Sequence, residues 1–124
     1  MAMGKVLRAI RGATTLDIDT QEEVIKKTQE LLGEVFTKND LEEDDVVSIV
    51  FTTTPDIVSA FPATAARSMG LEDTPLLGAC EQSVAGSPKL CIRLLVHCYM
   101  DAPKSAVRHV YLHGATVLRP DIRS

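Results

Sequence analysis

The apolar run at residues 90–99 constrains the fold more than any other segment of this chain. It is built from leucine, isoleucine, valine, cysteine and a few polar residues, and it contains no acidic side chain. Residues 46–52 form a second apolar run that is rich in β-branched side chains, which are typical of strands. Neither run approaches the ~18 apolar residues that a membrane-spanning helix needs. The chain is therefore expected to build a sheet with a buried face.

Shorter patterns predict the other elements. Residues 5–12 predict a strand that stops at Gly12 and is closed by Arg11, and Thr20 followed by Glu23 predicts the capping box of a helix. Residues 61–67 predict a second helix, which starts at a proline and ends at a glycine. The acidic stretch at residues 40–45 predicts a solvated loop. Three short strands are predicted at residues 75–79, 107–112 and 115–118, and the last two are expected to form a hairpin. The order β-α-β-α-β-β-β indicates an α+β fold with helices on one face of a sheet.

Length and composition exclude several classes of protein. A chain of 124 residues without a linker or repeat predicts a single domain, residues 1–124. The net charge of −4 argues against a nucleic-acid partner, and the N-terminus lacks the apolar core of a signal peptide. Three cysteines, Cys80, Cys91 and Cys98, lack the spacing of a disulfide framework, so we expect a reducing, cytoplasmic location. Cys91 and Cys98 lie in the apolar run and are expected to be small buried hydrophobes.

Common catalytic signatures are missing from the sequence. It has no glycine-rich phosphate loop, no GxSxG, no HExxH and no CxxC. The histidines, His97, His109 and His113, lack partners at metal-ligand spacing, so we expect surface or hydrogen-bonded histidines and no metal site.

The informative residues are arginines within apolar strands. Arg93 lies between Ile92 and Leu94, and a buried guanidinium without a partner is very costly. It must therefore find a carboxylate, for which Glu81 is a candidate, or face a pocket that receives one. Arg11 has the same two interpretations, and Tyr111 is a residue of either the core or a site. The residues by themselves indicate a soluble binder of small anions.

Beyond these patterns, the sequence resembles the trimeric chorismate mutase family. The resemblance rests on short blocks in the family's order and spacing that cover nearly the whole chain: AIRGATT (9–15), TTPD (53–56), FPA (61–63), CIR (91–93), RHVYL (108–112) and VLRPD (117–121). It implies a mixed sheet with helices on one face, and a pseudo-α/β-barrel homotrimer with active sites between subunits. It also implies an isomerase that rearranges chorismate to prephenate without a cofactor, in the shikimate pathway to phenylalanine and tyrosine.

The same resemblance assigns roles to residues. Arg11 would hold a substrate carboxylate, Tyr111 would hydrogen-bond in the same region, and Arg93 would bridge a carboxylate and the ether oxygen. Glu81 would accept a hydrogen bond from the ring hydroxyl. Further lining residues from the same chain would be Leu77, Gly78, Ala79 and Cys80. The neighbouring subunit's wall and rim would be formed by Phe61, Ala63, Arg67, Leu118 and Arg119.

Two positions depart from the family pattern, and two other functions stay open. Gly78 stands where a member may carry cysteine, and Thr64 stands where lysine can occur, so substrate capture is expected to weaken. One alternative is an imine or enamine deaminase on a similar trimeric scaffold, which would release ammonia and leave chorismate untouched. The other is a sensor of anionic metabolites, for which the acidic stretch at residues 40–45 is poorly suited.

Overall fold

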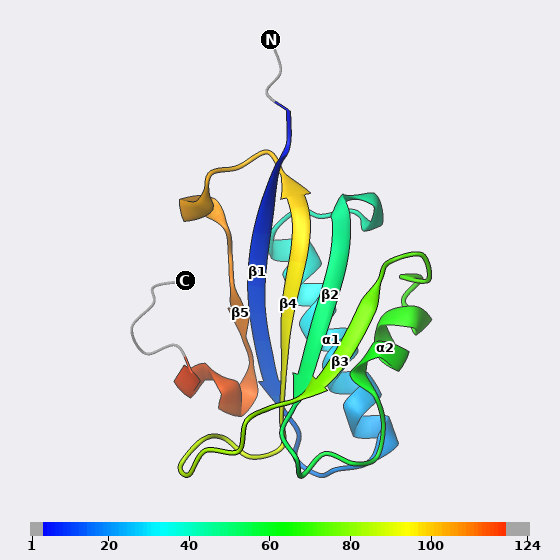
Figure 1. Cartoon of the computed structure of the whole chain (residues 1–124), viewed down its shortest axis with the longest axis vertical. Coiled ribbons are helices and arrows are strands. Elements are labelled where there is room, and N and C mark those ends of the chain that lie inside the picture. Colours follow the sequence, from blue (N-terminus) through cyan, green and yellow to red (C-terminus); the bar gives the residue numbers. More distant parts are fainter. Residues whose placement is uncertain (1–3, 119–124) are drawn as a thin grey trace.

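Within residues 4–118, which the computed structural model describes, five strands form one sheet and two α-helices pack behind it (Figure 1). The strands are β1 (Val6–Thr15), β2 (Val46–Thr53), β3 (Leu76–Cys80), β4 (Cys91–Met100) and β5 (Val110–Tyr111). The α-helices are α1 (Gln21–Lys38) and α2 (Pro62–Ser68). Short 3-10 helices are η1 (Glu43–Asp45), η2 (Lys104–Ala106) and η3 (His113–Leu118).

The strand order β3-β2-β4-β1-β5 places the apolar run of the sequence at the centre of the sheet, as β4. β4 pairs antiparallel with both β1 and β2, whereas β3 pairs parallel with β2, and β5 pairs parallel with β1. Residues of both α-helices join the same buried core on one side of this sheet. The predicted α+β fold, with a mixed sheet and helices on one face, is confirmed.

Alternate residues of β4 face opposite sides of the sheet. Ile92 and Leu94 are buried beneath the helices, whereas Arg93 and Leu95 point the other way and are half-buried. We call the side that carries Arg93 and Leu95 the open face; it is turned toward the viewer in Figure 1. The α-helices cover the other side of the sheet, whereas on the open face Ala13 and Cys91 pack against Ala115 of η3 and the rest is largely uncovered, an arrangement that antiparallel pairs allow.

Helix α1 begins where the sequence predicts. The Thr20 hydroxyl accepts a hydrogen bond from the backbone N–H of Glu23 (3.1 Å), which satisfies one of the free amides of the first turn. The reciprocal bond of the predicted capping box is not made, because Thr20 N donates to Ile18 O. The Glu23 carboxylate instead accepts from Asp17 N (3.0 Å) and holds the preceding turn. No helix within residues 4–118 combines the length and the apolar character that crossing a bilayer requires.

The first strand runs through Gly12 to Thr15, so the prediction that it stops at Gly12 was wrong. This glycine lacks the positive φ of a turn residue. A Cβ atom at Gly12 would lie 3.0 Å from Leu94 Cδ1 and 3.3 Å from Leu31 Cδ1. Gly12 therefore lies in close contact with leucine side chains of β4 and α1, and Arg11 lies inside the strand rather than at its end.

The predicted C-terminal hairpin is also wrong, because the second of its strands is the 3-10 helix η3 (His113–Leu118). β5 is two residues long and pairs parallel with β1. β1 ends at Thr15, so the chain after β5 has no further strand residues of β1 to pair with. It turns into η3 there, where Gly114 N donates to the Thr15 hydroxyl (2.9 Å). There Ala115 is buried against Ala13.

The acidic stretch at residues 40–45 is largely exposed, as predicted, but part of it is ordered as η1. Asp45 accounts for this order, because its carboxylate pairs with Lys5 Nζ (2.6 Å) and accepts from Glu42 N (2.9 Å). The hydrogen bond from Lys5 lowers the pKa of Asp45. The stretch is thus a surface anchor for the start of β1.

Candidate active site

The open face is hollowed where β1, β4 and β2 lie side by side. This hollow has a volume of about 360 Å³, and we call it the arginine hollow. It is lined by Arg11, Gly12, Val50, Thr52, Glu81, Arg93, Leu94, Leu95 and Tyr111. Four of the residues that the sequence singled out, Arg11, Glu81, Arg93 and Tyr111, therefore come together in one place.

Arg93 reaches the hollow because strand alternation turns it away from its buried neighbours. Its side chain is 31% exposed, and Nε lies 3.5 Å from Glu81 Oε2. The expectation that this arginine finds a carboxylate in Glu81 is confirmed. The contact has ion-pair distance without hydrogen-bond geometry, and within the described residues the buried Nε donates no hydrogen bond. Arg93 lines the hollow, where the remaining donors of its guanidinium can reach a bound oxygen.

Glu81 is held in place from two directions. Its backbone N–H donates to Thr53 O (2.7 Å), which continues the pairing of β3 with β2 by one residue. Its carboxylate oxygen Oε2 accepts from Thr52 Oγ1 (2.6 Å) and is the same oxygen that faces Arg93. The other oxygen, Oε1, accepts no hydrogen bond from the described residues. One oxygen thus anchors the side chain, and the second is left for a donor in the hollow.

Arg11 and Tyr111 form the opposite wall. The Arg11 Cζ atom lies 5.9 Å from the centroid of the Tyr111 ring, which is within cation–π range. Arg11 is exposed and makes no ion pair with a carboxylate of the described residues. The interpretation of Arg11 as half of a protein ion pair is therefore not supported there. Its guanidinium lies over the ring of Tyr111, and Arg11 lines the hollow.

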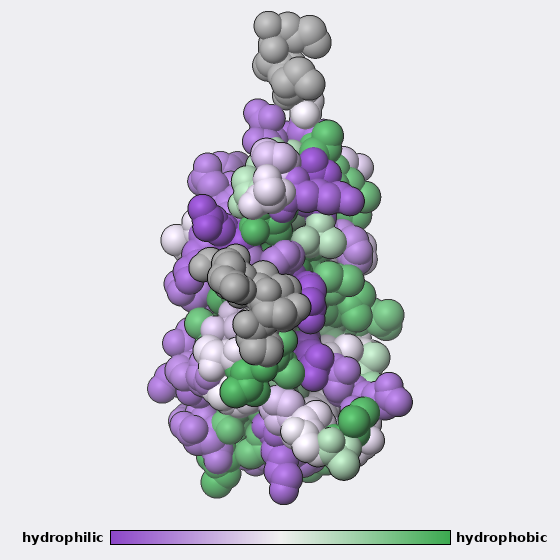
Figure 2. Space-filling view, turned by 90° about the vertical axis from the view of Figure 1, so that its left-hand side faces the viewer, coloured by the Kyte–Doolittle hydropathy of each residue, from purple (hydrophilic) through white to green (hydrophobic). Residues whose placement is uncertain are grey.

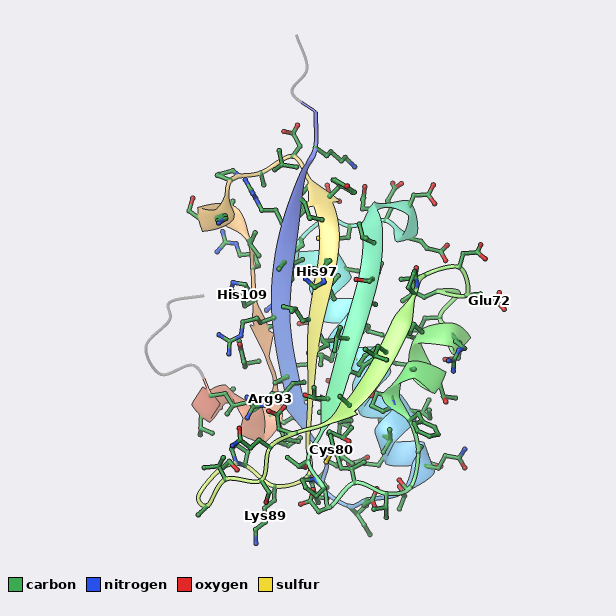
Figure 3. The ribbon with its side chains drawn as sticks, viewed as in Figure 1. Glu72, Cys80, Lys89, Arg93, His97 and His109 are labelled. Atoms are coloured by element: carbon green, nitrogen blue, oxygen red, sulfur yellow. The ribbon has the colours of Figure 1, made fainter. Side chains whose placement is uncertain are left out.

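The residues before Glu81 belong mostly to a second hollow, of about 640 Å³. Gly78, Ala79 and Cys80 line it together with Phe61, and Cys80 is labelled at the lower end of the sheet in Figure 3. Leu77 is 64% exposed and lines neither hollow. Within one chain, the stretch from 77 to 81 does not line a single site, because β3 is an edge strand and Glu81 alone reaches Arg93.

The other residues assigned to a neighbouring subunit lie away from the arginine hollow of their own chain. Phe61 is 76% exposed at the start of α2, and Arg67 is exposed in the last turn of this helix. Ala63 packs against the main core, and Leu118 packs beside Ala115. Arg119 lies outside the described residues.

Two of the histidines and two of the cysteines fill structural positions. His97 Nδ1 lies 3.4 Å from Ser48 Oγ, and His113 Nε2 pairs with Glu30 (2.8 Å), which lowers the pKa of that carboxyl. Cys91 and Cys98 are buried, as predicted, and burial raises the pKa of both thiols. Among residues 4–118, no group of three or more histidine, cysteine or acidic side chains could hold a metal ion.

Several residues of the site were not found from the sequence. Thr52 anchors Glu81, and Leu95 and Val50 form the apolar floor. Leu95 follows Arg93 by two residues, so strand alternation alone would have placed it on the same face. Thr52 faces Arg93, and Val50 faces Leu95, only through the pairing of β2 with β4, which the sequence does not specify.

The chemistry of the arginine hollow follows from its charges. Two guanidinium groups and one carboxylate give it a net positive character, and an apolar floor limits competing water. Among the described residues, its lining contains no serine, cysteine, histidine or lysine that could act as a nucleophile. The arrangement is suited to bind an anion, fix its shape and stabilise negative charge that grows during a reaction.

Comparison with known proteins agrees with this geometry. The sequence model of the family described as chorismate mutase type I matches residues 7–122. The chain is 41% identical over 118 residues to the chorismate mutase AroH of Bacillus subtilis (strain 168), covering 94% of this chain and 93% of that protein. It is 43% identical over 120 residues to the chorismate mutase AroH of Thermus thermophilus, covering 96% of this chain and 98% of that protein.

A solved structure is similar as well. The chorismate mutase from Clostridium thermocellum, Cth-682, superposes with a TM-score of 0.87 at 50% sequence identity. The match covers 89% of this chain and 98% of that one. Fold and sequence therefore point to the same family.

Proposed function

This chain belongs to the chorismate mutase type I family, and we propose that it is an isomerase that converts chorismate to prephenate in the biosynthesis of phenylalanine and tyrosine. The observation that carries the proposal is the meeting of Arg93, Glu81, Arg11 and Tyr111 in one hollow. We further propose that residues 1–124 act as one cytoplasmic domain. The free cysteines Cys80, Cys91 and Cys98 fit a reducing compartment.

The proposed reaction makes few demands on the protein. Chorismate carries two carboxylates and an enolpyruvyl ether, and in a 3,3-sigmatropic rearrangement its ether C–O bond breaks while a C–C bond forms in the same molecule. No atom enters or leaves, so neither a nucleophile nor a proton donor is needed. The protein has to hold the flexible side chain over the ring, and to stabilise the charge that shifts to the ether oxygen.

Arg11 and Tyr111 would meet the first demand. The Arg11 guanidinium carries several donors in a planar fork, which matches the two oxygens of a carboxylate. Cation–π attraction to the Tyr111 ring, whose centroid lies 5.9 Å from Cζ, favours positions of the fork over this ring before substrate arrives. A carboxylate held in this way keeps chorismate in the compact conformer from which the rearrangement proceeds.

Arg93 would meet the second demand. Its Nε faces Glu81 and its half-buried side chain lines the hollow, so an ether oxygen bound there would receive one of the remaining guanidinium donors, held in place by the carboxylate. Since negative charge grows on that oxygen only in the transition state, the donor lowers the barrier more than it strengthens substrate binding. One such donor is worth about 3–4 kcal/mol. An acceleration of about a millionfold requires about 8 kcal/mol, so Arg93 and conformer selection together could supply it.

Glu81 would have a positioning and a binding role. Its oxygen Oε2 faces Arg93 and accepts from Thr52, so it offsets local positive charge and fixes the guanidinium. Its free oxygen Oε1 would accept a hydrogen bond from the ring hydroxyl of chorismate. An acid at this position thus supports the arginine while leaving one acceptor for substrate.

We propose that three chains complete the site. The open face has exposed apolar side chains on three strands, including Leu7 (52%), Leu77 (64%) and Tyr99 (46%), and a surface of this kind favours burial against another chain. The arginine hollow is open to solvent in one chain, and Phe61 and Arg67 lie elsewhere on that chain. A homotrimer in which Phe61, Ala63, Arg67, Leu118 and Arg119 of a neighbour form the wall and rim would close it.

The direct test follows chorismate absorbance in the presence of purified protein, with prephenate identified as the product. Loss of chorismate with stoichiometric formation of prephenate supports the proposal. Unchanged chorismate together with ammonia release from an imino acid would instead identify the deaminase alternative. Unchanged chorismate with reversible binding of an anionic metabolite would indicate a sensor.

A further inference from the structure

The backbone of Arg11 is held by a side chain at the edge of the sheet. Arg11 N donates to the ring nitrogen Nδ1 of His109 (2.9 Å). His109 directly precedes β5, and Figure 3 labels it on the outer side of β1, while His97 is labelled on β4. The same edge faces the viewer in Figure 2, where hydrophilic and hydrophobic residues alternate over the surface. A backbone amide of a candidate binding residue therefore depends on an imidazole.

The strand pairing explains why a ring takes this position. β5 pairs parallel with β1, and Leu112 N donates to Ala13 O (2.9 Å). In a parallel ladder extended by two residues, the Arg11 amide would donate to the carbonyl of Arg108. That carbonyl accepts from Asn39 Nδ2 (2.9 Å) instead, and Arg108 N donates to Asn39 Oδ1 (2.8 Å).

Asn39 thus occupies both backbone groups that would continue the ladder. It is buried at the end of α1, where its Nδ2 also donates to Val35 O (2.9 Å), so its side chain is fixed. The Arg11 amide then needs another acceptor, because an amide of a strand that is left unbonded weakens the local structure. The His109 ring supplies that acceptor.

We propose that His109 is a positioning residue for Arg11, and that its ring, with Nδ1 unprotonated, keeps the Arg11 guanidinium over Tyr111 and aimed into the arginine hollow. The inference rests on the proposed role of Arg11 in holding a substrate carboxylate. His109 itself lines the neighbouring hollow of about 420 Å³, so its ring acts through the Arg11 backbone and does not touch substrate.

The bond between Arg11 N and the His109 ring depends on the protonation state of the ring. An imidazole accepts at Nδ1 only when this nitrogen is unprotonated, and an imidazolium has two donors and no acceptor. Protonation would set an N–H of the ring against the Arg11 N–H and break the bond. The charged or titratable side chains that line the hollow beside His109 are Arg8 from β1, His97 from β4 and Lys104 from η2. Chorismate binding should therefore weaken as the pH falls through the interval of about 5 to 8 in which histidines titrate.

The experiment compares two substitutions that differ in one property. His109→Asn keeps an acceptor oxygen near the position of Nδ1 and does not titrate, whereas His109→Leu removes the acceptor. At pH 7.5, His109→Leu should raise KM about three- to tenfold, the effect of one lost hydrogen bond, and lower kcat less. His109→Asn should keep a KM near the starting value, and its KM should no longer rise as the pH is lowered. His113→Asn is the matched control, because His113 is exposed and its positive φ of 54° suits asparagine.

Hydrogen exchange at the Arg11 amide provides a readout that is independent of turnover. The amide should be protected in the parent protein and in His109→Asn, and should exchange faster in His109→Leu. A folded His109→Leu protein with unchanged KM and unchanged protection overturns the proposal, as does a His109→Asn protein that is as impaired as His109→Leu. If Arg11→Ala leaves KM unchanged, the proposed role of Arg11 fails, and exchange at the amide still decides whether His109 holds the backbone.

Discussion

Arg93 Nε and Glu81 Oε2 lie 3.5 Å apart, and the same Glu81 oxygen accepts a 2.6 Å hydrogen bond from Thr52. The three side chains come from β4, from the residue that follows β3, and from β2. An arginine that is held on one side by a fixed carboxylate keeps its remaining donors in a defined direction. A structural and a catalytic role for Arg93 can be distinguished by mutation, because they predict different kcat values when Arg93 and Glu81 are replaced.

Arg93→Ala is expected to lower kcat by at least ~10²–10³, as the loss of a comparable transition-state donor does in other enzymes. Arg93→Lys should also lower kcat strongly, because it keeps the charge but loses the planar fork. Steady-state kinetics provide the measurement, with circular dichroism and particle mass to verify folding. If Arg93 only paired with Glu81 for stability, replacing both by apolar residues of similar volume would leave kcat largely intact. A folded Arg93→Ala protein with near-normal kcat would contradict the mechanism.

Thr52→Val should lower activity about tenfold, because it removes the hydroxyl that holds the Glu81 carboxylate, and hydrogen bonds to charged groups are worth about 1.5–3 kcal/mol. Thr52→Ser keeps the hydroxyl and should retain most of the activity. Both are compared by kcat/KM and by the urea midpoint of unfolding. Equal activity of the serine and valine variants would show that the bond to Glu81 does not matter for turnover.

The protein is expected to be a homotrimer with a mass three times the 13.5 kDa of one chain. Size exclusion coupled to light scattering measures this mass. Leu7→Asp, on the open face, should lower both the mass and the activity, whereas Ile18→Asp, which changes an exposed apolar residue before α1, should alter neither. A fully active monomer would rule out a site shared between chains.

Arg67→Ala at the rim should raise KM more than it lowers kcat.

Removal of metal ions should leave turnover unchanged, because the proposed rearrangement needs only positioned donors. The measurement is activity after exhaustive dialysis against EDTA, with and without added divalent metals. Arg93→Ala serves as the inactive reference, so that residual turnover is not mistaken for the uncatalysed reaction. Activity that disappears on dialysis and returns with a metal would overturn the assignment of the chemistry to the arginines.

Gly12→Ala should lower the free energy of unfolding by about 1–3 kcal/mol, the usual effect of overpacking a core. The added methyl group would meet Leu94 at 3.0 Å and Leu31 at 3.3 Å. Gly33→Ala is the matched control, because a Cβ there has no neighbour within 4 Å and lies in the interior of α1. This change should stabilise the protein by about 0.5–1 kcal/mol. Urea unfolding followed by circular dichroism measures both, and equal effects of the two changes would contradict the packing role of Gly12.

The sequence by itself determined features that depend on neighbours along the chain. The start of α1 at Thr20, the end of α2 near Gly70 and the central strand β4 follow from local patterns of capping, turn and apolar residues. The need of Arg93 for a carboxylate follows from the cost of burying a lone charge. These are short-range or general energetic rules, which hold whatever the rest of the chain does.

Only the tertiary structure decided what depends on contacts between distant segments. Gly12 looks like a strand end in sequence but is a close-packing position, because β4 and α1 approach it from elsewhere in the chain. β5 pairs with β1 and does not form the predicted hairpin with the residues that follow it. The hydrogen bonds of Asn39 to Arg108 leave the Arg11 amide to the ring of His109. Strand partners and registers are chosen by the combined packing of the whole sheet, and no local pattern of residues encodes that choice.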